Sequence, residues 1–134
     1  MLPEVYGIDY RSTDYFLENY LSSNDIIISV MPQTLEYYIG RKGDYYLQSY
    51  TNRQIFYDVS DTSGTYLDKY IGSQVVRDIQ ELMDVTNNYK KVYLVATPYS
   101  AFRSSNDKLI DEFIRKNGKI IYESYKTRVY VLEN

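Results

Sequence analysis

Apolar residues near the start of the chain first follow a helical spacing and then form a short continuous run. Asp9 or Ser12 can cap a first helix, because their side-chain oxygens accept hydrogen bonds from the free amide groups of its opening turn. The run at residues 25–30 is β-branched and apolar on both faces, which predicts a central parallel strand. The apolar stripe of the helix comprises Phe16, Leu17, Tyr20 and Leu21, with Asp14, Glu18 and Asn19 elsewhere on its surface.

A second, shorter helix is predicted directly after this strand. Pro32 suits its first position, where the missing amide hydrogen costs nothing, and Gly40 ends it. A second strand is predicted at residues 45–47. Residues 48–74 are the least regular part of the chain, and we expect a short strand at 54–58 or a helical turn at 66–70 within them.

The alternation of helices and strands resumes at Ser73. Val76, Ile79, Leu82 and Met83 keep helical spacing, with Arg77, Asp78 and Glu81 on the outer side, and Asn87 and Asn88 close that helix. A core strand follows at residues 91–96. The last helix is capped by Ser104, Ser105 or Asn106, carries an apolar stripe and ends at Gly118; the stripe comprises Leu109, Ile110, Phe113 and Ile114.

Two strands at residues 119–122 and 128–132 end the pattern. The link between them is too short for a parallel crossover, so we expect an antiparallel hairpin. The whole order predicts one α/β domain over residues 1–134. We expect a three-layer Rossmann-like open sheet, mostly parallel, with this hairpin at its C-terminal edge.

Composition narrows the chemistry. The 134 residues include no Cys and no His, which excludes a Ser-His-Asp triad, a thiol nucleophile and the usual zinc sites. The net charge is −3, and the short basic pairs Arg41-Lys42 and Lys90-Lys91 are typical of solvated loops, so no nucleic-acid partner is expected. No apolar run approaches the length of a membrane span, and we expect a soluble chain.

Ligands of open α/β sheets bind beyond the carboxyl ends of the strands. After the first strand, residues 30–34 (Val-Met-Pro-Gln-Thr) replace the Gly-rich turn of a dinucleotide site, and no P-loop pattern occurs. We therefore expect no nucleotide, no metal and no other cofactor. Asp9 and Glu36 offer an acid–base pair of the kind that hydrolyses glycosides, but as a helix cap and a solvated helix residue they have simpler roles.

Tyrosine is the strongest compositional signal, with 18 residues. Its flat apolar face and single hydroxyl suit stacking on sugars and half-buried interfaces. Five tyrosines fall in predicted helix stripes or strands and are expected to pack there: Tyr20, Tyr38, Tyr93, Tyr122 and Tyr130. The candidate ligand-binding residues lie in irregular segments or on the short second helix: Gln33, Glu36, Tyr37, Tyr50, Tyr57, Tyr66, Tyr70 and Tyr99.

Several stretches together resemble a known family. They are Gly7–Ser12, Phe16–Tyr20, Asp25–Ser29, Pro32–Gly40, Lys91–Val95 and Val129–Glu133. This pattern resembles the C-terminal soluble domain of membrane glycosyltransferases of the GT-C type, the protein-mannosyltransferase-like and lipid A arabinosyltransferase-like enzymes. The resemblance is weakest across residues 48–74.

The resemblance implies a domain on the extracytoplasmic side of a membrane, belonging to an enzyme that uses polyprenyl-phosphate-linked sugars. Its partners would be the membrane-embedded part of the same polypeptide and a glycan or protein acceptor. The family's catalytic carboxylates lie in the membrane part, so no catalytic residue carries over to this chain. The domain would cover the membrane active site or help to bind acceptor. Two alternatives stay open: a free-standing carbohydrate- or protein-binding module, and a carboxylate-based hydrolase.

Overall fold

The computed structural model describes residues 8–48, 57–59, 65–68, 71–97 and 105–133, and for residues 57–59 and 106 it describes the backbone alone. The helices in these ranges are α1 (Tyr10–Tyr20), α2 (Pro32–Ile39), α3 (Ile79–Asn88) and α4 (Ser105–Asn117). The strands are β1 (Ile26–Ser29), β2 (Tyr45–Leu47), β3 (Tyr57–Val59), β4 (Tyr66–Asp68), β5 (Gln74–Val76), β6 (Lys91–Ala96), β7 (Gly118–Ser124) and β8 (Thr127–Glu133).

All eight strands belong to one mixed sheet in the order β3-β4-β5-β2-β1-β6-β8-β7. The four central strands, β5, β2, β1 and β6, are parallel. The β7–β8 hairpin extends the sheet in antiparallel fashion beyond β6, which confirms the predicted C-terminal hairpin. Strands β4 and β3 add a second antiparallel extension beyond β5.

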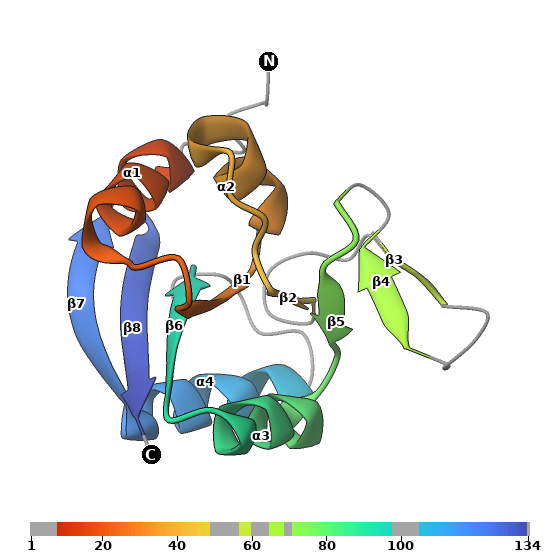
Figure 1. Cartoon of the computed structure of the whole chain (residues 1–134). Helices are drawn as coiled ribbons and strands as arrows, with labels where there is room; N and C mark the ends of the chain where they lie inside the picture. The colour runs from red at the N-terminus through yellow and green to blue at the C-terminus, as the bar shows by residue number, and fades with distance from the viewer. Residues whose placement is uncertain (1–7, 49–56, 60–64, 69–70, 98–104, 134) are drawn as a thin grey trace.

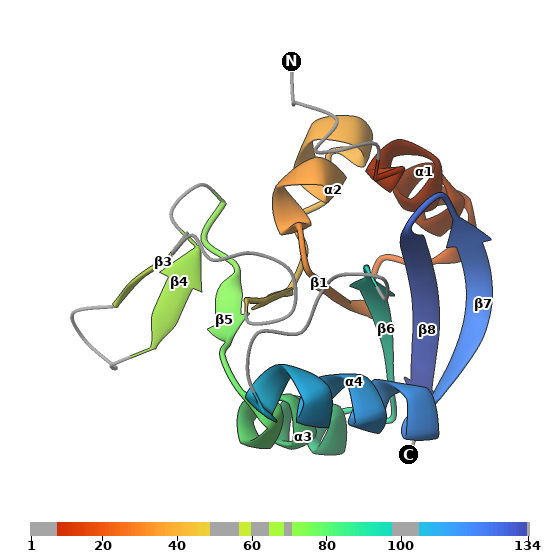
Figure 2. The same ribbon diagram turned by 180° about the vertical axis from the view of Figure 1, so that it is seen from behind.

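The helices form two pairs at opposite ends of the molecule. α1 and α2 lie side by side at one end, α3 and α4 lie side by side at the other, and the strands run between them (Figures 1 and 2). The apolar core lies around β1 and β6, whose buried side chains include Ile27, Ile28, Leu94 and Val95. None of the described helices combines the length and the apolar character that crossing a membrane requires.

The predicted helix from Ser73 is wrong over its first residues. Gln74–Val76 form β5, which pairs with β2 in parallel, and the Ser73 hydroxyl donates to the Gly43 carbonyl. The helix begins only at Ile79, after Asp78 caps it by accepting from the Glu81 amide at 2.9 Å. The expected helical turn at 66–70 is also wrong where it is described, because Tyr66–Asp68 form β4.

The apolar stripe of α1 is rotated from the predicted one. Tyr10, Thr13, Asp14 and Leu17 are buried, so Asp14 is not on the solvent side. Tyr20, predicted to pack, is 53% exposed. Large exposed residues interrupt two other predicted stripes as well, namely Met83 of α3 and Leu109 of α4.

Arg41 is not a solvated loop charge. Its guanidinium donates to the carbonyls of Ser22 (2.9 Å) and Asp25 (2.7 Å), in the link between α1 and β1. The basic pair at 41–42 therefore includes a residue, Arg41, whose side chain fixes the backbone between α1 and β1. Charge-assisted hydrogen bonds of this kind are among the stronger ones in proteins.

Gly118, where α4 passes directly into β7, provides a test of the packing. A Cβ atom there would lie 2.6 Å from the Ile114 carbonyl oxygen and 2.9 Å from Cδ1 of Tyr130. We predict that Gly118→Ala lowers the free energy of unfolding by about 1–3 kcal/mol, the usual range for overpacking. Denaturant unfolding measures this loss.

Gly40→Ala is the control for Gly118→Ala. Gly40 has a φ of +65° and no atom within 4 Å of its Cβ position, so its substitution meets backbone strain without a clash. The expected cost is about 1 kcal/mol. A Gly118→Ala variant as stable as the original chain would contradict the packing described here.

Candidate functional site: a cavity between the sheet and α3

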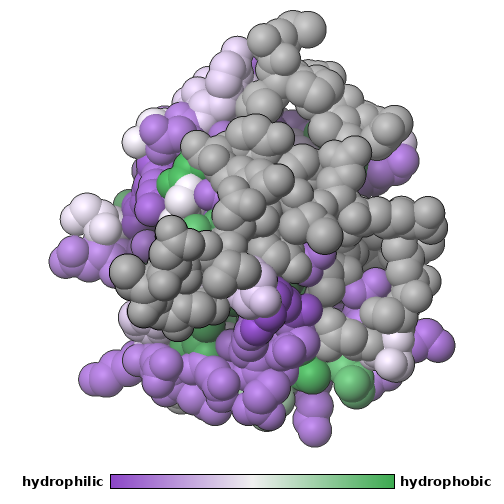
Figure 3. Space-filling model, turned by 90° about the vertical axis from the view of Figure 1, so that its right-hand side faces the viewer, coloured by the Kyte–Doolittle hydropathy of each residue, from purple (hydrophilic) through white to green (hydrophobic). Residues whose placement is uncertain are grey.

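The structure contains a cavity of about 300 Å³ beside β4, β5 and α3. This volume lies at the lower end of the usual range for small-molecule sites, roughly 300–1,000 Å³. Figure 3 faces the side of the molecule where β3, β4 and β5 lie. The lower part of that view, at the level of α3 and α4, is mostly hydrophilic. The lining residues are Tyr45, Thr65, Tyr66, Gln74, Val75, Val76, Arg77, Glu81, Asp84, Val85 and Asn88.

A stacked aromatic ring and guanidinium form one wall of the cavity. Cζ of Arg77 lies 3.9 Å from the ring centroid of half-buried Tyr66, which is cation–π geometry. The Arg77 side chain also donates to Glu81, with Nη2 2.7 Å from Oε2. These bonds lower the pKa of Glu81 against the opposing effect of burial, so the carboxylate stays ionised. Arg77 is thus neutralised by Glu81 while it supports the ring of Tyr66.

The remaining walls carry hydrogen-bonding groups over an apolar base. Val76 and Val85 are buried, whereas Asp84 and Asn88 are exposed on α3. Gln80 donates to Oδ1 of Asp84 at 3.0 Å. The cavity therefore combines an aromatic ring with acceptor and amide groups.

Two tyrosine hydroxyls meet near the far end of α3. The hydroxyl oxygens of Tyr45 and Tyr89 are 3.1 Å apart, and the Tyr45 ring lines the cavity. Burial and the bond to Tyr89 raise the pKa of Tyr45 to about 12. The phenol stays protonated at neutral pH, so it acts as a neutral hydrogen-bonding group. Arg77 and Glu81 balance each other and Tyr45 is neutral, so the Asp84 carboxylate leaves the lining of the cavity with one net negative charge.

The structure separates the predicted ligand-binding residues. Tyr66 lines the cavity, and the backbone of Tyr57 pairs with Asp68 on the neighbouring strand. Three candidates fall outside the residues that the structure describes: Tyr50, Tyr70 and Tyr99.

Gln33, Glu36 and Tyr37 lie on α2, at the end of the molecule opposite α3 (Figure 1). The Oε1 atom of Gln33 is buried and accepts no hydrogen bond from the part of the chain that the structure describes. Glu36 is exposed, and the ring of Tyr37 is 58% exposed with its centroid 5.1 Å from that of Tyr38. These three residues do not contribute to the cavity.

Asp9, proposed as half of an acid–base pair with Glu36, serves as the cap of α1. Its Oδ1 accepts from the Ser12 amide at 3.0 Å and its Oδ2 from the Ser124 hydroxyl. Burial acts to raise the pKa of Asp9, but the bonds from Ser124 and Ser12 and the charge of Arg11 outweigh it and lower the pKa. A carboxylate held ionised by these bonds is a poor proton donor, which weakens the hydrolase alternative.

Sequence reasoning missed the partners of Tyr66. Arg77 and Glu81 were placed on the outer side of a helix, whereas Arg77 follows β5 and Glu81 lies in the first turn of α3. Their spacing of four residues was the available signal, because it is typical of paired charges. Only the antiparallel contact between β4 and β5 brings this pair to Tyr66.

A second site of interest is the carboxyl group of Asp14, between α1 and α2. Asp14 is 0% exposed, and among the described residues no group donates a hydrogen bond of ordinary geometry to either carboxyl oxygen. Burial raises its pKa to about 7, and the nearby Thr34 hydroxyl, which donates to the Met31 carbonyl at 2.9 Å, offsets only part of the rise. Its neighbours among the titratable groups are Tyr10 and Asp9 on its own element and Tyr46 of β2 beside Tyr10.

Comparison of the chain with models of known protein families, with curated proteins and with solved structures gives no match.

Asp14 makes the stability of the fold depend on pH. In the unfolded chain its pKa returns to the value near 3.8, so between about pH 4 and pH 7 the folded state binds a proton that the unfolded state has lost. This contribution favours folding at low pH and is lost as the pH rises through that window. We predict that Asp14→Asn removes a decline of up to about 1.4 kcal/mol per pH unit.

Urea unfolding of the original chain and of Asp14→Asn between pH 4 and pH 8 measures this difference. Asp9→Asn is the control, because the lowered pKa of Asp9 stabilises the fold above its unfolded pKa near 3.8. This contribution is nearly constant between pH 4 and pH 8, so its loss should lower the whole curve without changing its slope. Parallel curves for Asp14→Asn and the original chain would contradict the assignment.

Proposed function

We propose that this chain is a carbohydrate-binding α/β domain whose cavity beside α3 holds a sugar unit of a glycan acceptor. The contact between Tyr66 and Arg77 carries the proposal. A guanidinium on the ring fixes the orientation of a half-buried aromatic face that lines a cavity. Aromatic faces bind the apolar face of a sugar ring, while surrounding polar groups bind its hydroxyls.

The net negative charge that Asp84 gives the cavity disfavours an anionic ligand and is compatible with a neutral ligand that donates hydrogen bonds. Arg77 is paired with Glu81 and Tyr45 keeps its proton, so neither presents a free charge. Neutral polyhydroxylated rings need donors and acceptors more than charges. The small volume favours one sugar unit over a dinucleotide.

We propose further that the domain is the noncatalytic, extracytoplasmic part of a polyprenyl-phosphate-sugar-dependent membrane glycosyltransferase of the GT-C type. The support is the resemblance in sequence. The stretches that carry it form α1, β1, α2, β6 and part of β8, away from the cavity. In this proposal the membrane part of the same polypeptide carries out the transfer and the cavity helps to hold the acceptor.

A three-layer Rossmann-like arrangement of the sheet between the two helix pairs is part of the same proposal. Two residues of β8, Thr127 and Tyr130, support it. The Thr127 hydroxyl lies 2.6 Å from that of Thr13 in α1, whereas the Tyr130 ring lies against Gly118 at the end of α4. Contacts to α1 and to the end of α4 thus come from two different positions of one strand.

Tyr66→Ala tests the cavity as a sugar site. We predict that a glycan array or an NMR titration with simple sugars detects binding, and that Tyr66→Ala weakens it about tenfold through loss of the stacking surface. Tyr37→Ala is the matched control, because it removes an equal ring from α2, outside the cavity. Absence of binding to every sugar, or an equal loss in the control, would contradict the proposal.

The gene tests the membrane part of the proposal separately. We predict that the reading frame upstream of Met1 encodes several apolar stretches of about 20 residues, the length that spans a bilayer. A frame without such stretches would rule out the glycosyltransferase while leaving the sugar site to its own test.

A further inference from the structure

Helix α3 contributes a row of side chains to the lining of the cavity. Their spacing of three and four residues places them on one side of the helix: Glu81, Asp84, Val85 and Asn88. Glu81 is already paired with Arg77, and Val85 is buried. Asp84 and Asn88, which are exposed, are therefore the polar side chains through which α3 can contact a ligand.

The Asp84 carboxylate is oriented by its own helix and has room for further hydrogen bonds. Gln80, one turn earlier, donates to Oδ1 of Asp84 at 3.0 Å. None of the salt bridges among the described residues includes Asp84. A carboxylate offers about four acceptor positions, so the bond from Gln80 does not saturate it.

The polar row of α3 is held next to the aromatic wall of the cavity. Arg77 contacts both the Tyr66 ring, at 3.9 Å from Cζ to the centroid, and the Glu81 carboxylate, at 2.7 Å. Asp84 follows Glu81 by less than one helical turn. A ligand that lies against Tyr66 in this cavity is thus within one turn of α3 from the Asp84 carboxylate.

Asn88 extends the polar row by one turn beyond Asp84. Four residues of helix rise about 6 Å, a length comparable with the width of one sugar ring. The carboxylate of Asp84 only accepts hydrogen bonds, whereas the amide of Asn88 both donates and accepts. The two side chains together therefore suit a ligand that presents several hydroxyl groups along one edge.

A carboxylate in this position distinguishes neutral sugars from acidic ones. Two adjacent hydroxyls of a sugar ring can both donate to one carboxylate, and hydrogen bonds to a charged acceptor are stronger than those to a neutral one. A uronic acid instead brings a second negative charge close to Asp84, which is unfavourable. The same group thus favours one class of sugar and disfavours the other.

We propose that the Asp84 carboxylate accepts hydrogen bonds from two adjacent hydroxyls of the bound sugar unit and thereby selects neutral sugars over uronic acids. Gln80 is a positioning residue for this carboxylate, and Asn88 contacts a further hydroxyl. This inference rests on the proposed sugar site and adds its specificity.

A cationic ligand is the poorer alternative for Asp84. Ion pairs between exposed groups contribute little, because water screens them. The neutral groups on either side of Asp84, Gln80 and Asn88, supply direction but no charge. Hydrogen bonding to hydroxyls uses the whole row, whereas pairing with an ammonium group uses the carboxylate alone.

Titration with two series of sugars, followed by NMR, tests the proposal. The probes are methyl glycosides of neutral hexoses and methyl glycosides of the corresponding uronic acids. We expect the original chain to bind a neutral hexose about tenfold more tightly than its uronic acid. Asp84→Asn keeps the shape of the side chain, so it should weaken the neutral sugar about fivefold and strengthen the uronic acid. Loss of the fold would weaken both, so these opposite changes identify the carboxylate.

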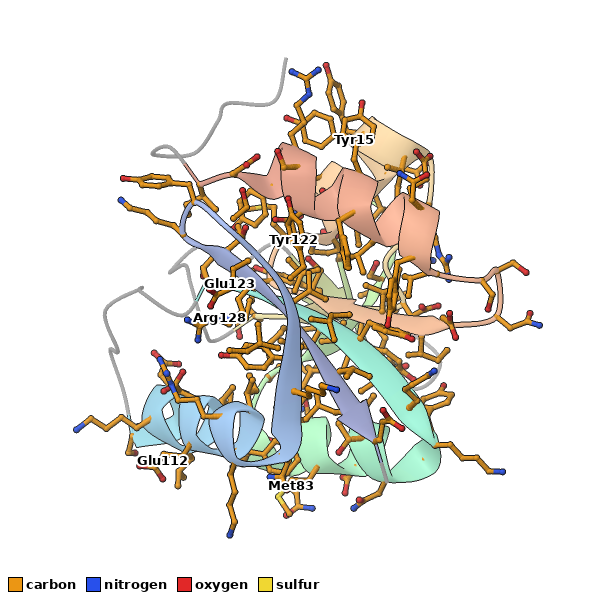
Figure 4. All side chains as sticks on the ribbon, turned by 90° about the vertical axis from the view of Figure 1, so that its left-hand side faces the viewer. Tyr15, Met83, Glu112, Tyr122, Glu123 and Arg128 are labelled. Atoms are coloured by element: carbon orange, nitrogen blue, oxygen red, sulfur yellow. The ribbon has the colours of Figure 1, made fainter. Side chains whose placement is uncertain are left out.

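Glu112→Gln is the matched control, because it removes an equal charge from an exposed position on α4 (Figure 4), outside the cavity. It should leave both affinities unchanged. An Asp84→Asn variant with the original preference, while Tyr66→Ala still weakens binding, would overturn this inference and leave the sugar site intact. Absence of binding to every sugar would overturn both.

Binding confined to a protonated amino sugar would assign Asp84 to charge pairing and would also overturn the inference. Should Asp84→Asn fail to fold, the original chain still decides, because equal affinity for the neutral and the acidic series contradicts selection by a carboxylate.

Discussion

The burial of one short strand, β1, determines where the rest of the structure lies. Ile27 and Ile28 have no exposed surface, and every residue of β1 pairs with β6 on one side while Ile28 and Ser29 pair with β2 on the other. The Ile27 amide also donates to the Asp44 carboxylate at 2.8 Å, so the start of β2 is fixed to β1. Because both edges of β1 are occupied, the strands that follow can extend the sheet only outward from β2 and from β6.

That constraint explains which elements the sequence predicts well. A strand buried on both faces needs an unbroken apolar run, and β1 and β6 show one. The hairpin of β7 and β8 was predictable because the link between the two predicted strands is too short for a parallel crossover. Strands β3, β4 and β5 have three residues each, too few to show a period of two, and Val75 and Val76 fit a helical spacing equally well.

The candidate site was predictable only in part, for a related reason. Tyr66 stood out as a tyrosine in an irregular segment, but its partner Arg77 reaches it across two strands that sequence spacing did not reveal. Asp14 was misplaced because it is charged, although its spacing from Tyr10 and Leu17 puts it on their buried side of α1. Helical spacing was the better guide to the burial of Asp14. A charged residue at a position whose spacing predicts burial is a candidate for a functional role.

The arrangement of charge around the cavity determines the kind of ligand that it suits. At the cavity, Arg77 lies between a carboxylate and a ring, so its charge is balanced inside the fold. The Asp84 carboxylate also lines the cavity and gives it a net negative charge. A balanced cation can orient a ligand without attracting anions. The contact of Tyr66 with the paired Arg77, more than the number of tyrosines, therefore distinguishes the cavity from the other tyrosine-bearing surfaces that the structure describes.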